Sequence, residues 1–168
     1  MIYLIWLLRI IHIGAGVFWI GASLTALLFL GPAVGATGEA GQRFMGYLIN
    51  TKNLSGRIAG AAGSSVLAGA ILYWIDSQGF SSAWMKSGAG IGFTIGAVFG
   101  LIGFIFGILV GRMNKAMAQL GAQMQGKPSP AQLTQMQTIQ KQLATYSKIT
   151  VPALILSVIF MSVARYLH

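Results

Sequence analysis

The chain contains no cysteine and only two acidic residues, Glu39 and Asp76. The absence of cysteine excludes disulfides, thiolate metal sites and haem attached through cysteine. The two acids fall on opposite predicted sides of the apolar spans, so they cannot form a pair of carboxylates for general acid–base catalysis. We also find no phosphate-binding loop and no Ser-His-Asp pattern. The side chains alone therefore do not indicate an enzyme, and a bound cofactor would have to supply any chemistry.

Charge of either sign is scarce, and long apolar runs replace it. The 168 residues are 55% hydrophobic and 8% charged, with a mean hydropathy of +0.74, whereas soluble domains carry roughly 25% charged residues. Runs of about 20 apolar residues match the thickness of a bilayer. We predict an all-α fold, a single transmembrane domain over residues 1–168 built as an integral membrane four-helix bundle. The expected spans are residues 10–30, 58–75, 90–111 and 149–167, and the first apolar stretch already starts at Ile2.

The basic residues predict the orientation of the bundle. Eight of the 11 Lys and Arg residues lie in or beside the first and third connections: Arg43, Lys52, Arg57, Arg112, Lys115, Lys127, Lys141 and Lys148. The other side has Arg9, Lys86 and Arg165. The positive-inside rule then places both connections in the cytoplasm and both termini outside, in a multi-pass protein of the bacterial inner membrane. These bases are spread around membrane borders, which favours the lipid bilayer as their partner and not nucleic acid.

The third connection predicts a helical hairpin over residues 112–148 on the cytoplasmic side. Its first arm continues the third span toward Met124, and the segment Gly126-Lys127-Pro128-Ser129-Pro130 ends it, because glycine and two prolines interrupt a helix. Ser129 is placed to cap the second arm, with Pro130 in its first turn. In the first connection, residues 39–49 are expected to form a short interfacial helix.

Glycines follow a helical period through the third span. They form one face along the whole span: Gly92, Gly96, Gly100, Gly103, Gly107 and Gly111. Such a face lets another backbone approach closely. We expect tight helix packing there, within the bundle, across a homo-oligomer or against a larger membrane complex. The alternative is that the smooth face accommodates a flat cofactor or a lipid tail.

His12 is the most informative single residue, because ionisable groups inside a span are expensive and usually functional. It shares one helical stripe with Arg9, Gly16, Trp19 and Ser23. As a cofactor ligand, His12 would bind iron, Arg9 would pair with a haem propionate and Gly16 would leave room for the macrocycle. As a structural residue, a neutral His12 would hydrogen-bond a backbone carbonyl. A proton or ion relay is a third interpretation.

The second ligand of such a site is not obvious. His168 and Met161 lie on the same predicted side as His12. Five-coordinate iron, or a symmetric site using His12 from two protomers, would also fit. Copper is the alternative metal, held by His12, His168, Met161 and Met85, because thioethers suit Cu(I).

The first span also resembles a known group of proteins. The stretch His-Ile-Gly-Ala-Gly-Val-Phe-Trp-Ile-Gly-Ala, from His12 through Trp19 and Gly21, is similar to the opening helix of small bacterial membrane proteins. That group includes the membrane part of copper-resistance protein D and the haem-binding protoporphyrinogen oxidases of the HemJ type. Residues 67–72 and 151–165 are similar to the group's second and closing helices. The resemblance implies an association with haem b or copper through His12, although the arginine and distal histidines of the oxidases have no counterpart here.

Overall fold

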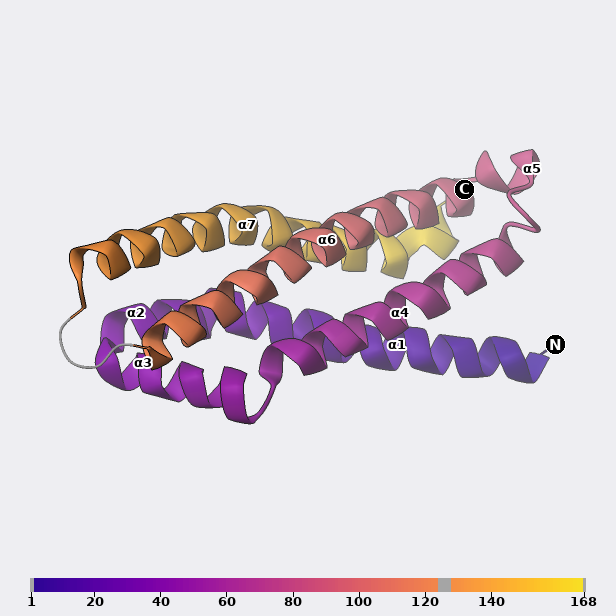
Figure 1. The fold of residues 1–168 in the computed structure, drawn as a ribbon. Coiled ribbons are helices and arrows are strands. Elements are labelled where there is room, and N and C mark those ends of the chain that lie inside the picture. Colours follow the sequence, from indigo (N-terminus) through magenta and orange to yellow (C-terminus); the bar gives the residue numbers. More distant parts are fainter. Residues whose placement is uncertain (1, 124–127, 168) are drawn as a thin grey trace.

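The chain folds into a bundle of long helices (Figure 1). The computed structural model describes residues 2–123 and 128–167, and those two ranges contain helices and turns but no strand. In chain order the elements are α1 (Ile2–Thr25), the π-helical segment η1 (Ala26–Leu30), α2 (Gly31–Thr37), α3 (Glu39–Gly46), the π-helical segment η2 (Tyr47–Thr51), α4 (Leu54–Asp76), α5 (Ser82–Met85), α6 (Gly88–Ala122), α7 (Pro130–Val163) and the 3-10 turn η3 (Ala164–Tyr166).

The helices confirm the predicted all-α class, and four of them are long and apolar enough to cross a membrane. They cover residues 2–37, 54–76, 88–122 and 130–166. The first is longer than the expected 10–30, because the apolar run begins at Ile2 and η1 continues the helix into α2. The start of α1, α5 and η3 lie at one end of the bundle, while α2, α3 and the start of α7 lie at the other (Figure 1). We call these the α5 end and the hairpin end.

Helix capping explains where α6 and α7 begin. The Ser129 side chain accepts a hydrogen bond from the Gln132 backbone N–H at 3.3 Å, and the Gln132 side chain accepts one from the Ser129 N–H at 2.9 Å. This capping box, followed by Pro130, confirms the predicted start of a helix at this position. Ser87 caps α6 in a similar way through the Gly90 N–H at 3.1 Å. The predicted breaker residues Gly126 and Lys127, and Met124 before them, lie outside the described residues.

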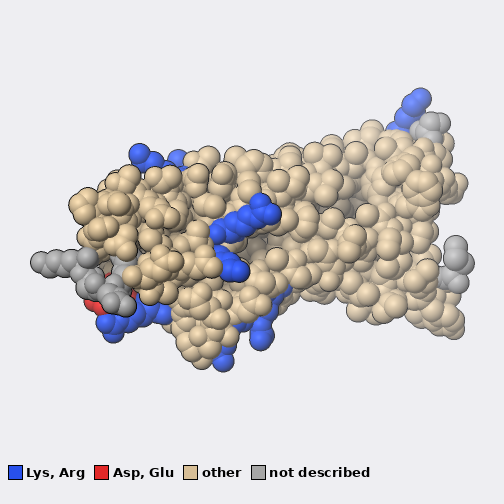
Figure 2. All heavy atoms as spheres, in the orientation of Figure 1, with Lys and Arg blue, Asp and Glu red and all other residues tan. Residues whose placement is uncertain are grey.

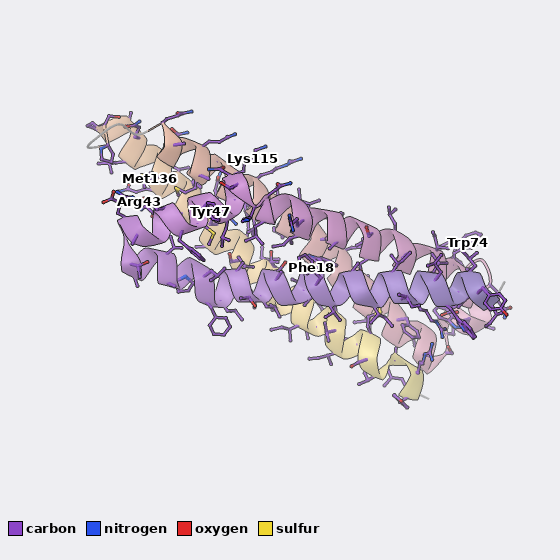
Figure 3. The ribbon with its side chains drawn as sticks, turned by 90° about the horizontal axis from the view of Figure 1, so that it is seen from below. Phe18, Arg43, Tyr47, Trp74, Lys115 and Met136 are labelled. Atoms are coloured by element: carbon purple, nitrogen blue, oxygen red, sulfur yellow. The ribbon has the colours of Figure 1, made fainter. Side chains whose placement is uncertain are left out.

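The surface of the bundle has an apolar zone along the spans and a charged zone toward the hairpin end. Large apolar side chains are exposed along the spans, among them Ile10 at 70% and Val17 at 70%, as expected for helices that face lipid. Lysine and arginine gather toward the hairpin end, and a broad uncharged zone follows on the face drawn in Figure 2. Figure 3 places Arg43, Tyr47, Lys115 and Met136 toward the hairpin end and Trp74 at the α5 end. Exposed tryptophan and tyrosine at such borders are typical of membrane interfaces.

Two helix pairs form the bundle, α1 with α4 and α6 with α7. Leu8, Ala68 and Leu72 form a small core between α1 and α4. A second core joins the pairs, where Trp19 of α1 and Ala62 of α4 meet Leu154 of α7. The Trp19 ring also contacts Phe104 of α6 edge-to-face, with the ring centroids 6.1 Å apart. This second core separates a cavity toward the α5 end from a pocket at the hairpin end.

The glycine face of α6 is covered over only part of its length. A methyl group on Gly92, Gly96, Gly100 or Gly103 would lie within 3.1 Å of an atom of α7, η3 or Leu167. By contrast, a methyl group on Gly107 or Gly111 would meet no atom within 4 Å. The first four glycines therefore let α6 and α7 pack closely, and the last two line the pocket at the hairpin end.

Candidate functional site

His12 joins α1 to α4 through two hydrogen bonds with Ser65. Its Nδ1 atom lies 2.8 Å from the Ser65 carbonyl oxygen, and the Ser65 hydroxyl donates to the His12 carbonyl at 2.9 Å. A carbonyl oxygen can only accept, so Nδ1 carries the hydrogen. In the neutral ring the lone pair then belongs to Nε2. This second nitrogen has no hydrogen-bond partner among the described residues and is not a buried unsatisfied atom, so it is accessible.

Small residues make the space that the imidazole occupies. A methyl group on Gly69 would lie 2.7 Å from His12 Cε1 and 2.8 Å from Nδ1. A methyl group on Gly16 would lie 3.1 Å from the Ser65 hydroxyl. Gly69 and Ser65 are one turn apart on α4, so one face of this helix provides both the notch and the hydrogen-bond acceptor. The ring is therefore fixed in position by the packing of α1 on α4.

Beside this ring lies a large cavity between the two helix pairs. Its volume is about 1060 Å³, and its lining is mostly apolar. It brings together four of the five cofactor residues that the sequence predicted: Arg9, His12, Gly16 and Met161. The fifth, His168, lies outside the described residues. Met85, the other predicted thioether, does not line this cavity; its sulfur accepts a hydrogen bond from the Tyr73 hydroxyl at 3.3 Å.

The mouth of the cavity carries charges from three helices. An Arg9 guanidinium nitrogen lies 3.9 Å from an Asp76 carboxylate oxygen, and both side chains are more than one third exposed. Arg165 of η3 lines the same cavity. The basic residues predict that Arg9 and Arg165 lie on one side of the membrane, but Asp76 was not predicted as a partner of Arg9. The signal was present, because Asp76 is the last residue of the second span on that side.

This arrangement suits an apolar ligand that has acidic groups at one end. The lining offers one imidazole nitrogen and one thioether, together with two guanidinium groups and one carboxylate. Within residues 2–123 and 128–167, no three His, Cys, Asp or Glu side chains cluster as a metal site would require. A bare metal ion would therefore depend on His12 and thioethers, whereas a cofactor that brings its own ligands needs only one or two protein atoms.

Comparisons with protein-family models, with curated proteins and with solved structures found no match to this chain.

Proposed function

We propose that the protein binds a redox cofactor in the His12 cavity, with haem b as the leading candidate and electron transfer as its role. The observation that carries the proposal is the His12–Ser65 hydrogen bond. Metal-bound histidines commonly donate their second ring N–H to a carbonyl oxygen, which fixes the tautomer and orients the other nitrogen toward the metal. Here that bond leaves the Nε2 lone pair free beside a cavity.

The residues around the cavity fit this cofactor. A volume of about 1060 Å³ slightly exceeds the roughly 300–1,000 Å³ typical of small-molecule sites, so it leaves room for a macrocycle. His12 would hold the iron, and Arg9 and Arg165 would pair with the propionates. Met161 would serve as a weak second ligand. When bound, haem b would supply one-electron transfer. The residues of the chain would exclude water and hold the cofactor near one membrane surface.

The decisive experiment separates ligation from helix packing by using two substitutions of His12. In His12→Asn, the side-chain amide can still donate to the Ser65 carbonyl but offers no ring nitrogen to iron. In His12→Ala, both functions are lost. We expect detergent-purified wild-type protein from haem-replete cells to show a Soret band that shifts on reduction, and both variants to lose it. His12→Asn should keep its thermal stability within about 0.5 kcal/mol, while His12→Ala loses about 1 kcal/mol.

Met161→Leu then tests the second ligand. It should keep the Soret band but change the spin state or the reduction potential, because the iron would lose one thioether bond. Wild-type protein that carries neither haem nor copper under these conditions would contradict the proposal. Copper detected by metal analysis without a haem spectrum would support copper handling in its place.

A second candidate function is a structural or assembly subunit of a larger membrane complex, and a different observation favours it. Several glycines outside the two pockets have open space around them: a methyl group on Gly14, Gly60 or Gly63 would meet no atom within 4 Å. Such faces permit close approach by helices of another chain. If this is the role, Gly60→Leu should release a co-purified partner or dissociate a homo-oligomer without lowering the thermal stability of the monomer.

We further propose that the hairpin end lies in the cytoplasm and that both termini lie outside. The enrichment of Lys and Arg in the first and third connections supports this orientation. A phosphatase reporter fused after His168 should be active in the extracytoplasmic compartment, and a fluorescent protein that folds only in the cytoplasm should stay dark there. The reverse pattern would overturn the orientation and move the His12 cavity to the inner leaflet.

A further inference from the structure

A second pocket, at the hairpin end, carries positive charge that no side chain of the described residues neutralises. It has a volume of about 840 Å³ and lies where all four spanning helices meet. Arg112 and Lys115 of α6 line it. Both acidic residues of the chain are engaged elsewhere, Glu39 with Arg43 and Asp76 with Arg9. Arg112 and Lys115 are exposed, and no acidic side chain competes there with an anionic ligand.

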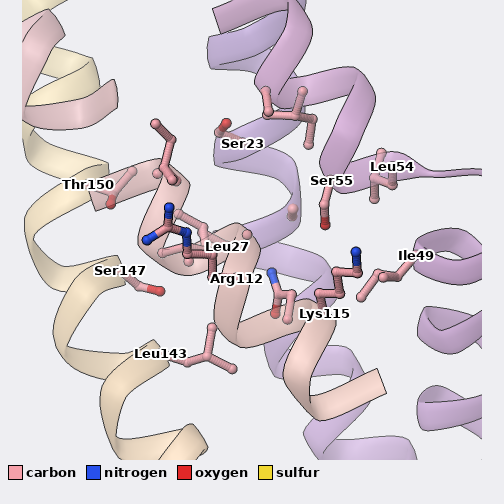
Figure 4. Close-up of a pocket in the computed structure, with 18 of the residues that line it drawn as sticks. Ser23, Leu27, Ile49, Leu54, Ser55, Arg112, Lys115, Leu143, Ser147 and Thr150 are labelled. Carbon is pink, nitrogen blue, oxygen red and sulfur yellow. The ribbon is translucent and has the colours of Figure 1, made fainter. Parts of the chain in front are cut away.

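The polar groups of the pocket cluster around these two bases. In Figure 4 the Arg112 guanidinium group lies on the α7 side, where Ser147 and Thr150 are found, and the Lys115 amine points toward Ser55. Ser147 has no hydrogen-bond partner for its hydroxyl within the described part of the chain, so it is available to a ligand. The Thr150 hydroxyl already donates to the Tyr146 carbonyl at 2.8 Å. The guanidinium, the ammonium and the Ser147 and Ser55 hydroxyls together suit the oxygen atoms of a phosphate.

The rest of the pocket is mostly apolar and extends along α6 toward the bilayer interior. Gly107 and Gly111 form a smooth wall, and Trp19 and Phe104 close the deep end. From Phe104 to Arg112 the helix rises about 12 Å at 1.5 Å per residue. A pocket with a phosphate-binding mouth and an apolar floor of that depth matches an amphiphile better than a free ion.

The level of the mouth also matches a lipid headgroup. Arg112 is the first charged residue after the apolar run of α6, and Arg57 and Lys148 mark the same transition on α4 and α7. In addition, the two π-helical segments η1 and η2 border the pocket through Leu27 and Ile49. Such segments are rare and frequently occur at functional sites.

We propose that this pocket binds an anionic phospholipid, with its phosphate at Arg112 and Lys115 and one acyl chain along Gly107 and Gly111. The site is separate from the His12 cavity, and the proposal does not depend on a cofactor there. Basic pockets between spanning helices are known to hold anionic headgroups. Binding would connect α4, α6 and α7 at the end where the glycine face of α6 is not covered by α7.

Trp19 provides a direct probe because its ring is only 5% exposed and is therefore shielded from bulk lipid. In a Trp6→Phe, Trp74→Phe, Trp84→Phe protein, Trp19 is the only fluorophore of its kind. In bilayers of mixed composition, phosphatidylglycerol brominated at mid-chain should quench it more strongly than brominated phosphatidylcholine. Arg112→Gln with Lys115→Gln should abolish this preference, an approximately 30-fold loss of relative affinity at about fivefold per base.

Lys141→Gln is the matched control, since Lys141 is exposed on α7 and does not line the pocket. It should keep the preference. Equal quenching by both lipids in the parent protein, or a preference that survives in the double variant, would overturn the proposal. Loss of the preference on adding millimolar inorganic phosphate at constant ionic strength would show a free-phosphate site and overturn the lipid assignment. Native mass spectrometry of the unsubstituted chain should independently retain phosphatidylglycerol, and the double variant should lose it.

Discussion

Gly103 and Gly107 are one turn apart on α6, yet they have different surroundings. A methyl group on Gly103 would lie 2.6 Å from Leu154 Cδ2, while one on Gly107 would meet no atom within 4 Å. Toward the α5 end, α6 and α7 pack backbone against backbone, whereas toward the hairpin end the same glycine face borders an open pocket. The comparison teaches that glycine spacing defines a face of a helix but does not determine what covers it.

The largest effect that separates the two halves of α6 should come from leucine at these two positions. Gly103→Leu forces α6 away from α7 and should lower the free energy of unfolding by about 3 kcal/mol, the upper end of overpacking costs. Gly107→Leu should cost less than about 0.5 kcal/mol, because the side chain enters the pocket. Thermal unfolding followed by circular dichroism in detergent measures both. A similar loss at both positions would mean that α7 also covers Gly107.

The same pair sharpens the lipid proposal. Gly107→Leu fills part of the apolar floor, so it should reduce retention of phosphatidylglycerol although the fold stays stable. A variant with normal stability and normal lipid retention would show that the acyl chain lies elsewhere.

A smaller difference is expected from two serines of α7. The Ser157 hydroxyl donates to the Gly96 carbonyl of α6 at 2.9 Å in a buried position, so Ser157→Ala should cost about 0.6 kcal/mol, a typical value for such bonds in membranes. Ser147 lines the open pocket, and Ser147→Ala should leave unfolding unchanged while weakening lipid retention. Equal destabilisation by both changes would argue against an open hairpin end.

Much of this fold could be predicted from the lengths of the apolar runs and from local sequence motifs. Four apolar runs of sufficient length require four spanning helices, because backbone groups in lipid must be paired within the segment. The Ser129 capping box was equally predictable, since every residue in it is local. The helix that contains the first predicted span is longer than that span, because its apolar run begins at Ile2 and the π-helical turn at 26–30 continues it into α2.

The candidate site was predictable only residue by residue. His12 and Arg9 could be found because ionisable groups are rare inside apolar runs. Their partners Ser65 and Asp76 could not, because each contact depends on which faces of α1 and α4 meet. The hairpin-end pocket could not be predicted either, since it depends on where α6 and α7 stop packing against each other. The bases there predict the orientation of the bundle, but their sequence positions do not show that they line one pocket.

The smallest effect on stability, and a sharp test of the α5 end, should come from Arg9 and Asp76. Their ion pair is long, at 3.9 Å, and partly exposed, so Arg9→Gln and Asp76→Asn should each change the free energy of unfolding by no more than about 0.5 kcal/mol.

Haem titration distinguishes the two roles of Arg9. If Arg9 pairs with a propionate, Arg9→Gln should weaken haem binding, whereas Asp76→Asn should strengthen it, because the competing carboxylate charge is removed. If Arg9 serves only as the partner of Asp76, both variants should bind haem with the affinity of the wild-type protein. Lys86→Gln, which removes a base at the same end outside the cavity lining, controls for the overall loss of positive charge and should leave haem affinity unchanged.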